Sequence, residues 1–357
     1  MSPDRILLYC RAGFESECAQ EIMDLAVESG GAGYVRAHKE TGYVEFVETM
    51  PGAALTIHRN VPFERLVFAR QWFLTNALIE DLPERNRVEP LVERYHQLGV
   101  RFGHLWIESP DTNEGKELAT FCRKFTAPLS QTMKKARLLS AKSDEALPVG
   151  HVFFLDSRRA FVGYHLPKNG SEHQGGIMRL KFPGEAPSRS TLKLDEAILT
   201  FLSEADRERL LRPSGKAVDL GAAPGGWTWQ LVRRGLFVTA VDNGPMAPAL
   251  METGQVTHKR EDGFRFQPKQ PVDWMVCDMV EQPRRVAELM GDWLAQGWCR
   301  QTIFNLKLPM KKRYEELRSC LNRIELRLEA AGLKFRLRAR QLYHDREEVT
   351  VYVELMP

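Results

Sequence analysis

The chain has 357 residues, a length that predicts two domains at the usual ~150 residues per domain. Hydrophobic residues make up 43% of the sequence and charged residues 27%, a balance that is typical of a folded globular protein and excludes a disordered one. The net charge of +3 excludes a polycation, and no apolar run reaches the ~20 residues that span a bilayer.

The N-terminal segment and the cysteines both favour a cytoplasmic protein. The apolar run over residues 6–9 is too short for the core of a signal peptide, and no small-residue cleavage site follows it. The six cysteines contain no C-x-x-C pair and no Cys/His cluster with zinc spacing. We therefore expect free, buried thiols in a reducing compartment and no metal site.

The N-terminal half alternates short strands and helices. Apolar spacing and turn residues predict strands over 6–10, 42–47, 65–74, 104–107, 152–155 and 160–164, and helices over 16–29, 89–98 and 118–138. A polar segment rich in proline and glycine follows, over residues 167–187. We place an N-terminal domain at 1–170, a linker at 171–186 and a C-terminal domain at 187–357.

The C-terminal half has the pattern of an α/β sheet. Strands are predicted over 216–220, 237–241, 272–277, 302–306 and 348–355, and helices over 227–234 and 314–331. The second helix carries Leu317, Leu321, Ile324 and Leu328 on one face. Strands separated by helices predict a doubly wound, mostly parallel sheet.

A glycine-rich turn follows the first of these strands, in residues 219–227 (DLGAAPGGW). Glycine lets the backbone approach a ligand closely, and nucleoside cofactors bind at the carboxyl end of the first strand in open α/β sheets. The turn is neither a G-x-G-x-x-G fingerprint nor a P-loop, which makes a dinucleotide oxidoreductase the least favoured class. Many turns carry glycine for geometry alone, so the whole nine-residue unit is the stronger signal.

Three carboxylates follow successive predicted strands. Asp242 lies ~20 residues after the glycine turn, where an acid accepts hydrogen bonds from ribose hydroxyls in such folds. An ordinary turn aspartate before Asn243 and Gly244 is the alternative. We interpret residues 261–263, which include Asp262, as another strand-end loop at the same edge, and Asp278 follows the strand over 272–277. We expect the three carboxylates to form a polar rim around one crevice.

These residues resemble those of the RrmJ/FtsJ-type ribose 2′-O-methyltransferases, specifically over residues ~185–357. Within that superfamily, the chain as a whole is most similar to the RlmM family of ribosomal RNA large subunit methyltransferases. The resemblance implies a C-terminal Rossmann-like methyltransferase domain that uses S-adenosylmethionine. It also implies an N-terminal α+β RNA-binding region made of ferredoxin-like and THUMP-like parts.

The resemblance also assigns site residues. It implies a catalytic Lys-Asp-Lys-Glu tetrad at Lys193, Asp278, Lys307 and Glu348, with Glu347 as the alternative for the last position. The implied cofactor contacts are Ser190, Gly221, Ala223, Pro224, Gly225, Gly226, Asp242, Asp262 and Asp278. The implied substrate is a cytidine ribose in 23S ribosomal RNA, free or in an assembling large subunit, with no part for DNA or a membrane.

The chemistry of a ribose hydroxyl agrees with two lysines. A 2′-hydroxyl is a poor nucleophile that needs a base or a donor for the forming alkoxide. A lysine is ordinarily protonated at neutral pH; a second lysine and partial burial disfavour its charge, whereas carboxylates favour it. We therefore expect Lys307 to accept the proton, Lys193 to support it, and Asp278 and Glu348 to orient the amines.

Lys193 also departs from local preference. If Ser190 is a helix N-cap, Lys193 lies in the first turn, where glutamate or glutamine is preferred. A residue that breaks a local rule is often functional, although a solvated lysine is the ordinary alternative. Cys277 is expected to be a buried strand residue rather than the nucleophile of a C5-pyrimidine methyltransferase, because Val276 and not proline precedes it.

Two regions are locally basic. Residues 120–170 hold nine Lys/Arg against three Asp/Glu, and residues 300–340 hold twelve against four, a distribution that suits either an RNA backbone or a solvated face. The run 121–137, which includes Phe121 and Phe125, and residues 311–313 (KKR) are the candidate RNA contacts. Two alternative functions stay open: a methyltransferase for a base, a small molecule or another RNA, and a non-catalytic RNA-binding assembly factor.

Overall fold

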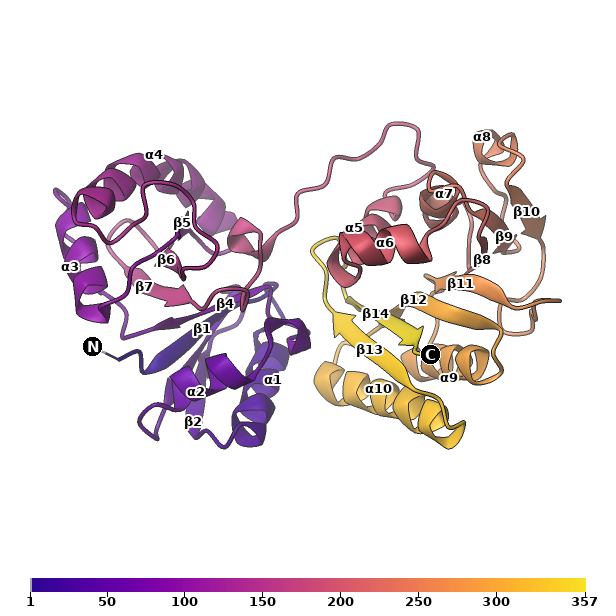
Figure 1. Cartoon of the computed structure of the whole chain (residues 1–357), viewed down its shortest axis with the longest axis horizontal. Coiled ribbons are helices and arrows are strands. Elements are labelled where there is room, and N and C mark those ends of the chain that lie inside the picture. Colours follow the sequence, from indigo (N-terminus) through magenta and orange to yellow (C-terminus); the bar gives the residue numbers. More distant parts are fainter. Residues whose placement is uncertain (1) are drawn as a thin grey trace. The chain divides into compact units, whose positions relative to one another are not determined.

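The computed structural model describes residues 2–357, which fall into two compact units, Met1–Ile177 and Met178–Pro357 (Figure 1). Each unit is built around its own seven-stranded sheet. Across residues 2–357, no helix combines the length and the apolar character needed to cross a membrane.

The first unit contains a mixed sheet in the order β2-β3-β1-β4-β7-β6-β5. Its strands are β1 (Arg5–Tyr9), β2 (Gly33–Ala37), β3 (Tyr43–Glu48), β4 (Gln71–Thr75), β5 (His104–Glu108), β6 (Val149–Phe154) and β7 (Ala160–His165). Its helices are α1 (Glu15–Glu28), α2 (Ala53–Asn60), α3 (Val88–Leu98) and α4 (Asn113–Lys135), with 3-10 turns η1 (Phe63–Arg65) and η2 (Gln174–Gly176). Only β5 and β6 pair in parallel.

The predicted strand over 65–74 is wrong in its first half, because the strand begins only at Gln71. The backbone N–H groups of Val67 and Phe68 donate to the carboxylate of Glu21 on α1, at 2.6 and 3.1 Å, so a side chain satisfies them instead of a neighbouring strand. Strand β2 and helix α2 were not predicted. The half-exposed β2 shows no clean alternation, and α2 has only eight residues.

The second unit contains a sheet in the order β10-β9-β8-β11-β12-β14-β13. Its strands are β8 (Lys216–Leu220), β9 (Phe237–Val241), β10 (Val256–Lys259), β11 (Val272–Cys277), β12 (Cys299–Lys307), β13 (Phe335–Arg340) and β14 (Glu348–Leu355). Its helices are α5 (Thr191–Phe201), α6 (Glu204–Leu210), α7 (Gly226–Val232), α8 (Pro248–Met251), α9 (Pro283–Ala295) and α10 (Arg313–Ala330).

The first five strands of this order are parallel, and β14 runs antiparallel between β12 and β13. The predicted doubly wound, mostly parallel sheet is therefore confirmed. From β8 the chain proceeds to β9 and β10 on one side and then returns to β11 on the other. This reversal between β8 and β11 is the place where ligands bind in such sheets, at the carboxyl ends of the strands.

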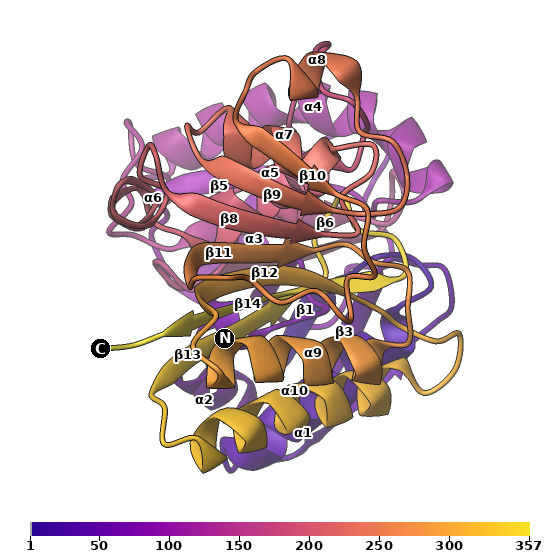
Figure 2. The same cartoon turned by 90° about the vertical axis from the view of Figure 1, so that its right-hand side faces the viewer.

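Helices cover both faces of the second sheet (Figure 2). Neighbouring residues of β12 show this directly, because side chains alternate between faces along a strand. The Thr302 hydroxyl lies 3.7 Å from the sulfur of Met290 on α9, whereas Ile303 joins a buried cluster that includes Ile198 of α5 and Leu231 of α7. Burial on both faces explains the continuous apolar character of these strands.

Candidate active site

The register of two paired strands brings four polar side chains onto one face of the second sheet. Lys307 at the end of β12 pairs with Glu348 at the start of β14, and Asn305 pairs with Thr350. Residues opposite each other in an antiparallel pair lie on the same face, as do residues two apart along a strand. The four side chains therefore form one block at the carboxyl end of β12.

Asp278 joins this block from the neighbouring strand. It follows β11 directly, and the last residue of that strand, Cys277, pairs with Phe304 of β12. Oδ1 of Asp278 forms an ion pair with Nζ of Lys307 and accepts a hydrogen bond from Nδ2 of Asn305 at 3.0 Å. The carboxylate is thus anchored by two groups from the adjacent strand.

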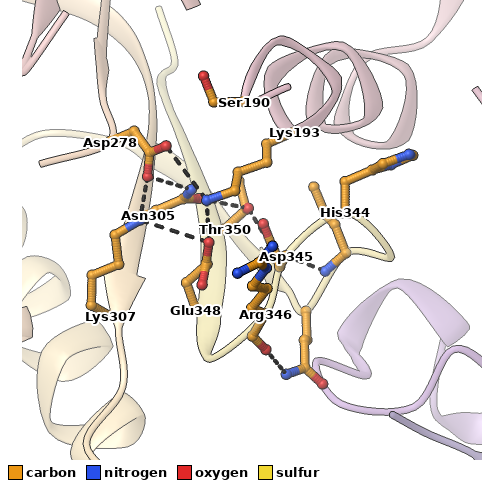
Figure 3. A network of polar contacts seen from close by, with 12 residues as sticks. Ser190, Lys193, Asp278, Asn305, Lys307, His344, Asp345, Arg346, Glu348 and Thr350 are labelled. Carbon is orange, nitrogen blue, oxygen red and sulfur yellow. Dashed lines mark hydrogen bonds and ion pairs between the residues drawn. The ribbon is translucent and has the colours of Figure 1, made fainter. Parts of the chain in front are cut away.

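Lys193 completes the group from α5. Its Nζ lies 3.5 Å from Oδ2 of Asp278 and forms an ion pair with Glu348. Glu348 also reaches the second amine, with its Oε1 3.7 Å from Nζ of Lys307 (Figure 3). Two lysines and two carboxylates, contributed by four segments of the second unit, form a closed ring of alternating charge, which we call the ion-pair ring.

Burial separates the two candidate glutamates. The side chain of Glu348 is 7% exposed and lies in the ion-pair ring, whereas that of Glu347 is 60% exposed and pairs with Arg313 at 2.5 Å. Successive residues of a strand point to opposite faces, so only one of the two can face the lysines. That residue is Glu348.

The ring fixes the charge of Lys193 and Glu348. Burial lowers the pKa of Lys193, but the carboxylates of Asp278 and Glu348 outweigh it and raise the pKa above its ordinary value. Burial raises the pKa of Glu348, but Lys193 and Lys307 outweigh it and lower the pKa. Lys193 is therefore held as an ammonium.

Ser190 stands at the N-cap position of α5, but its side chain makes no capping hydrogen bond. Its hydroxyl lies 2.7 Å from that of Ser188 instead. A Cβ on Gly226 would lie 2.3 Å from both hydroxyl oxygens, so glycine is required for the glycine-rich turn to approach the start of α5. Lys193 lies in the first turn of α5, as the sequence predicts.

The glycine-rich turn adopts a conformation that other residues rarely take. Gly221 and Gly225 have φ values of +76° and +117°, and the peptide bond between Ala223 and Pro224 is cis. A Cβ on Gly221 would lie 2.6 Å from Cγ of Met279. The turn is therefore packed closely against the segment that follows Asp278.

The acids after β9 and β10 lie beside this turn. Asp242 accepts a hydrogen bond from the backbone N–H of Ala223 at 3.0 Å and another from that of Gly244 at 2.7 Å. Asp262 follows β10, and a Cβ on its neighbour Gly263 would lie 2.9 Å from the sulfur of Met279. Strand-end carboxylates around a glycine turn fit a nucleoside cofactor whose ribose hydroxyls donate hydrogen bonds.

Cys277 cannot serve as a nucleophile at this site. It is completely buried, and burial raises the pKa of its thiol to about 12, so the thiolate is not formed at neutral pH. All six cysteines are free and buried, which confirms the expectation from their spacing. Methylation at C5 of a pyrimidine is therefore left without a candidate nucleophile.

Sequence analysis did not assign Asp219, whose carboxylate is buried in β8 and accepts a hydrogen bond from the hydroxyl of Thr228 at 2.6 Å. Burial raises the pKa of Asp219 from 3.8 to about 7. An acid with a raised pKa stabilises the fold below its unfolded pKa, and that stability is lost as the pH rises through the folded pKa. The carboxyl group of Asp219 therefore makes the fold less stable as the pH rises toward its folded pKa.

We expect the free energy of unfolding to fall between about pH 4 and pH 7 because of Asp219, by up to about 4 kcal/mol. Asp219→Asn removes the titration while its amide oxygen still accepts from Thr228, so the variant should lack this part of the fall. Urea unfolding across this pH range measures the difference. Asp273→Asn, at an exposed carboxylate on β11, is the control. Parallel pH curves for Asp219→Asn and the wild-type chain would contradict the assignment.

The fold and these contacts define a class. A mostly parallel sheet, a glycine turn after its first strand, an acid after the next strand and a Lys-Asp-Lys-Glu ring at the same edge are the features of a Rossmann-like methyltransferase domain. The match to an FtsJ-like methyltransferase family model over residues 186–331 agrees with this class. Glu348 lies beyond the matched residues, so the structure alone places it in the ring.

Two further family models match the first unit. The RlmM ferredoxin-like domain matches residues 3–73, and the N-terminal model of ribosomal RNA large subunit methyltransferase M matches residues 86–166. Ribosomal RNA large subunit methyltransferase M of Aggregatibacter aphrophilus (strain NJ8700) is 51% identical, covering 99% of this chain and 100% of the relative. That of Haemophilus influenzae (strain PittGG) is also 51% identical, with the same coverage.

The chain belongs to the ribosomal RNA large subunit methyltransferase M family. It is a methyltransferase with S-adenosylmethionine as its cofactor, which confirms the class expected from the glycine-rich turn and the lysines. A solved structure of TrmN from Thermus thermophilus covers 99% of each chain, with 15% identity and a TM-score of 0.34, and is too distant to add to the assignment.

Proposed function

We propose that the chain transfers a methyl group from S-adenosylmethionine to the ribose 2′-oxygen of a cytidine in 23S ribosomal RNA, in the cytoplasm. The ion-pair ring carries this proposal, because it places two amines and two carboxylates within ion-pair distance beside the cofactor turn. Methyl transfer to a small molecule or an exposed amine has no need of such a ring. The names of the relatives support large-subunit ribosomal RNA as the substrate.

The roles of the two lysines follow from their partners. S-adenosylmethionine supplies an electrophilic methyl group when it is bound. Lys193 is held as an ammonium by Glu348 and Asp278, and we assign the proton of the 2′-hydroxyl to Lys307, which pairs with Asp278. With the cofactor bound, the oxygen would take up the methyl group as the methyl–sulfur bond breaks, and the sulfur would keep the electron pair of that bond. Asp278 orients Lys307 through their ion pair, and the Lys193 ammonium stabilises the negative charge that develops on the oxygen.

The cofactor is proposed to lie against Ser190, the turn from Gly221 to Gly226, and the acids Asp242, Asp262 and Asp278. Glycine at 221 and 226 leaves no Cβ to obstruct the turn, and Asp242 already fixes the turn through the N–H of Ala223. This arrangement brings the cofactor turn and the ion-pair ring to one edge of the sheet, on either side of Met279.

The decisive experiment is methyl transfer from labelled S-adenosylmethionine to unmodified 23S ribosomal RNA, followed by nucleoside mass spectrometry. We expect the label in 2′-O-methylcytidine. Label in a base would replace the proposal with a base methyltransferase. Tight RNA binding without label, on both free RNA and assembling large subunits, would favour the assembly factor.

The first unit is proposed to hold the RNA through helix α4, as part of a THUMP-like region. Arg123, Lys124, Lys134 and Lys135 are exposed along this helix. The phenylalanines of the same helix serve a different purpose: the Phe121 and Phe125 rings stack at 5.5 Å, and both meet the ring of Phe154 on β6. They anchor α4 to the sheet, so the exposed cations, not the aromatic rings, are the candidate RNA contacts.

Reversing two of these charges should weaken RNA binding. We expect Arg123→Glu/Lys124→Glu to reduce affinity at low salt about tenfold or more, and to reduce the slope of log affinity against log salt by about 2, because each lost phosphate contact removes about one unit. Filter binding at several salt concentrations measures both. Lys39→Glu/Arg85→Glu, at two exposed residues outside α4, is the matched control. Equal losses of RNA affinity in the two double variants would contradict the proposal that α4 binds the RNA.

A further inference from the structure

A line of hydrogen bonds leads from the ion-pair ring to a buried acid that sequence analysis did not assign (Figure 3). Nδ2 of Asn305 donates to Oδ1 of Asp278 at 3.0 Å. The hydroxyl oxygen of Thr350 lies 2.7 Å from Oδ1 of Asn305 and 2.8 Å from Oδ2 of Asp345. Asn305, Thr350 and Asp345 are all 0% exposed, so no solvent water competes for these contacts. We call these three residues the buried chain.

The number of hydrogen atoms available in the buried chain decides which group donates and which accepts in each hydrogen bond. The carboxylate of Asp278 pairs with both lysines and only accepts hydrogen bonds, so the amide of Asn305 must turn its NH2 group toward it. The carbonyl oxygen of Asn305 therefore faces Thr350, whose single hydroxyl hydrogen must point there. Between the oxygens of Thr350 and Asp345, 2.8 Å apart, no hydrogen is left unless Asp345 carries it.

The oxygen of Asp345 that faces Thr350 has a second contact. The backbone N–H of Leu342 donates to the same Oδ2 atom at 2.9 Å. That oxygen must therefore accept from Leu342 and donate to Thr350, and only the hydroxyl of a neutral carboxyl group does both. An amide at this position offers either an oxygen that accepts or a nitrogen that donates.

The surroundings of Asp345 agree with this state. Complete burial raises the pKa of Asp345 well above its ordinary value, and the carboxylates of Glu348 on β14 and Glu196 on α5 raise it further. The contacts with Leu342 and Thr350 act in the opposite direction and do not outweigh burial. The ammonium of Lys193 is the cation of α5 that faces this acid.

We propose that neutral Asp345 directs the hydrogen bonds through Thr350 and Asn305, and that this buried chain holds Asp278 in the orientation that pairs it with Lys307 during methyl transfer. The three are positioning residues, since they act through Asp278, and the proposal rests on the proposed function. If Asp345 loses its proton, the Thr350 hydroxyl turns toward the new carboxylate. Asn305 then loses the donor that fixes its amide, and Asp278 loses its buried anchor.

Three threonine variants separate this role from a general effect on packing. Thr350→Val keeps the shape of the side chain and removes the hydroxyl, whereas Thr350→Ser keeps the hydroxyl. Thr302→Val makes the same change at another 0% exposed threonine on β12, whose hydroxyl contacts only the sulfurs of Met275 and Met290 among the described residues. Thr302 lies on the face away from the ion-pair ring, because it is three residues from Asn305 in the strand.

The kinetic test is methyl transfer to 23S ribosomal RNA at neutral and alkaline pH. We expect Thr350→Val to lower kcat about tenfold to a hundredfold, the effect of leaving buried polar groups without their partner, with little change in KM for S-adenosylmethionine or RNA. The pH dependence of its kcat should also differ from that of the wild-type chain. Thr350→Ser and Thr302→Val should both match wild type. A Thr350→Val variant that behaves like Thr302→Val, or a Thr350→Ser variant as slow as Thr350→Val, overturns the proposal.

The protonation of Asp345 can be measured without any substrate. Carbon-13 NMR of the full chain with labelled aspartate carboxyl groups, assigned with Asp345→Asn, should show a neutral carboxyl group at neutral pH. An ionised Asp345 there overturns the buried chain even if the enzyme is active. A wild-type chain that methylates no ribose sinks the proposed function itself, whereas an active wild type with an unaffected Thr350→Val sinks only the positioning role.

Discussion

Replacing Lys307 with alanine is expected to lower the rate of methyl transfer about a thousandfold or more while S-adenosylmethionine binds almost as before. The amine of Lys307 pairs with both carboxylates of the ion-pair ring, and the proposed mechanism gives it the proton of the 2′-hydroxyl. Its loss removes the proton acceptor. It leaves the glycine-rich turn and the Asp242 anchor in place, so cofactor binding should survive.

Lys307→Arg distinguishes a base from a fixed positive charge. Arginine stays protonated at every pH of interest, so it can pair with Asp278 but cannot accept a proton. We expect it to be as inactive as the alanine variant. An active arginine variant would show that Lys307 acts by its charge alone. Single-turnover methyl transfer and calorimetric titration of the cofactor provide the two readouts, with Lys269→Ala as the control at an exposed lysine of the second unit outside the basic regions.

The second large effect is expected at Asp242, where alanine should weaken S-adenosylmethionine binding about a hundredfold. The carboxylate accepts the backbone N–H groups of Ala223 and Gly244, and it is the acid placed to accept ribose hydroxyls. Removing it leaves two backbone donors without their acceptor and frees the glycine-rich turn. Hydrogen bonds to a charged group contribute about 1.5–3 kcal/mol each, so losing more than one accounts for this size.

Asp273→Ala is the matched control for Asp242→Ala. Asp273 is also a strand carboxylate that accepts a backbone N–H, that of Lys216 at 2.8 Å, but it lies near the start of β11, at the amino edge of the sheet. Calorimetric titration should show normal cofactor affinity for this control. If Asp242→Ala binds the cofactor normally, or if both variants lose cofactor affinity equally, cofactor binding does not depend specifically on Asp242, the acid after β9. Lys307→Ala and Asp242→Ala together should separate chemistry from binding.

The sequence by itself determined the class of the second unit. An apolar strand before a glycine turn is a local pattern, and so are strands that alternate with helices; the structure has both where they were predicted. Asp278 was found because it follows a predicted strand, whereas the two lysines were assigned by the resemblance of the short motifs around them to those of a known family. The membership of the family follows from the same residues and is confirmed by relatives across the whole chain.

The tertiary structure decided which side chains from different strands and helices lie next to one another. It chose Glu348 over Glu347 by burial, and it showed that Ser190 does not cap α5 through its side chain. It also found Asn305 and Thr350, whose pairing in β12 and β14 puts them beside Lys307 and Glu348. The alternation of side chains along a strand could have placed Asn305 on the same face as Lys307. No local sequence pattern could show that Asn305 pairs with Thr350.

The physical reason is the range of the interactions. Periodicity records which face of a strand or helix is buried, and the residues that show it are neighbours in the chain. Register between strands, and the burial that fixes the proton of Asp345, depend on residues far apart in sequence: Asn305 and Thr350 meet across 45 positions. The charges of the ion-pair ring could be named from the sequence, whereas the hydrogen bonds that hold them in place exist only in the folded sheet.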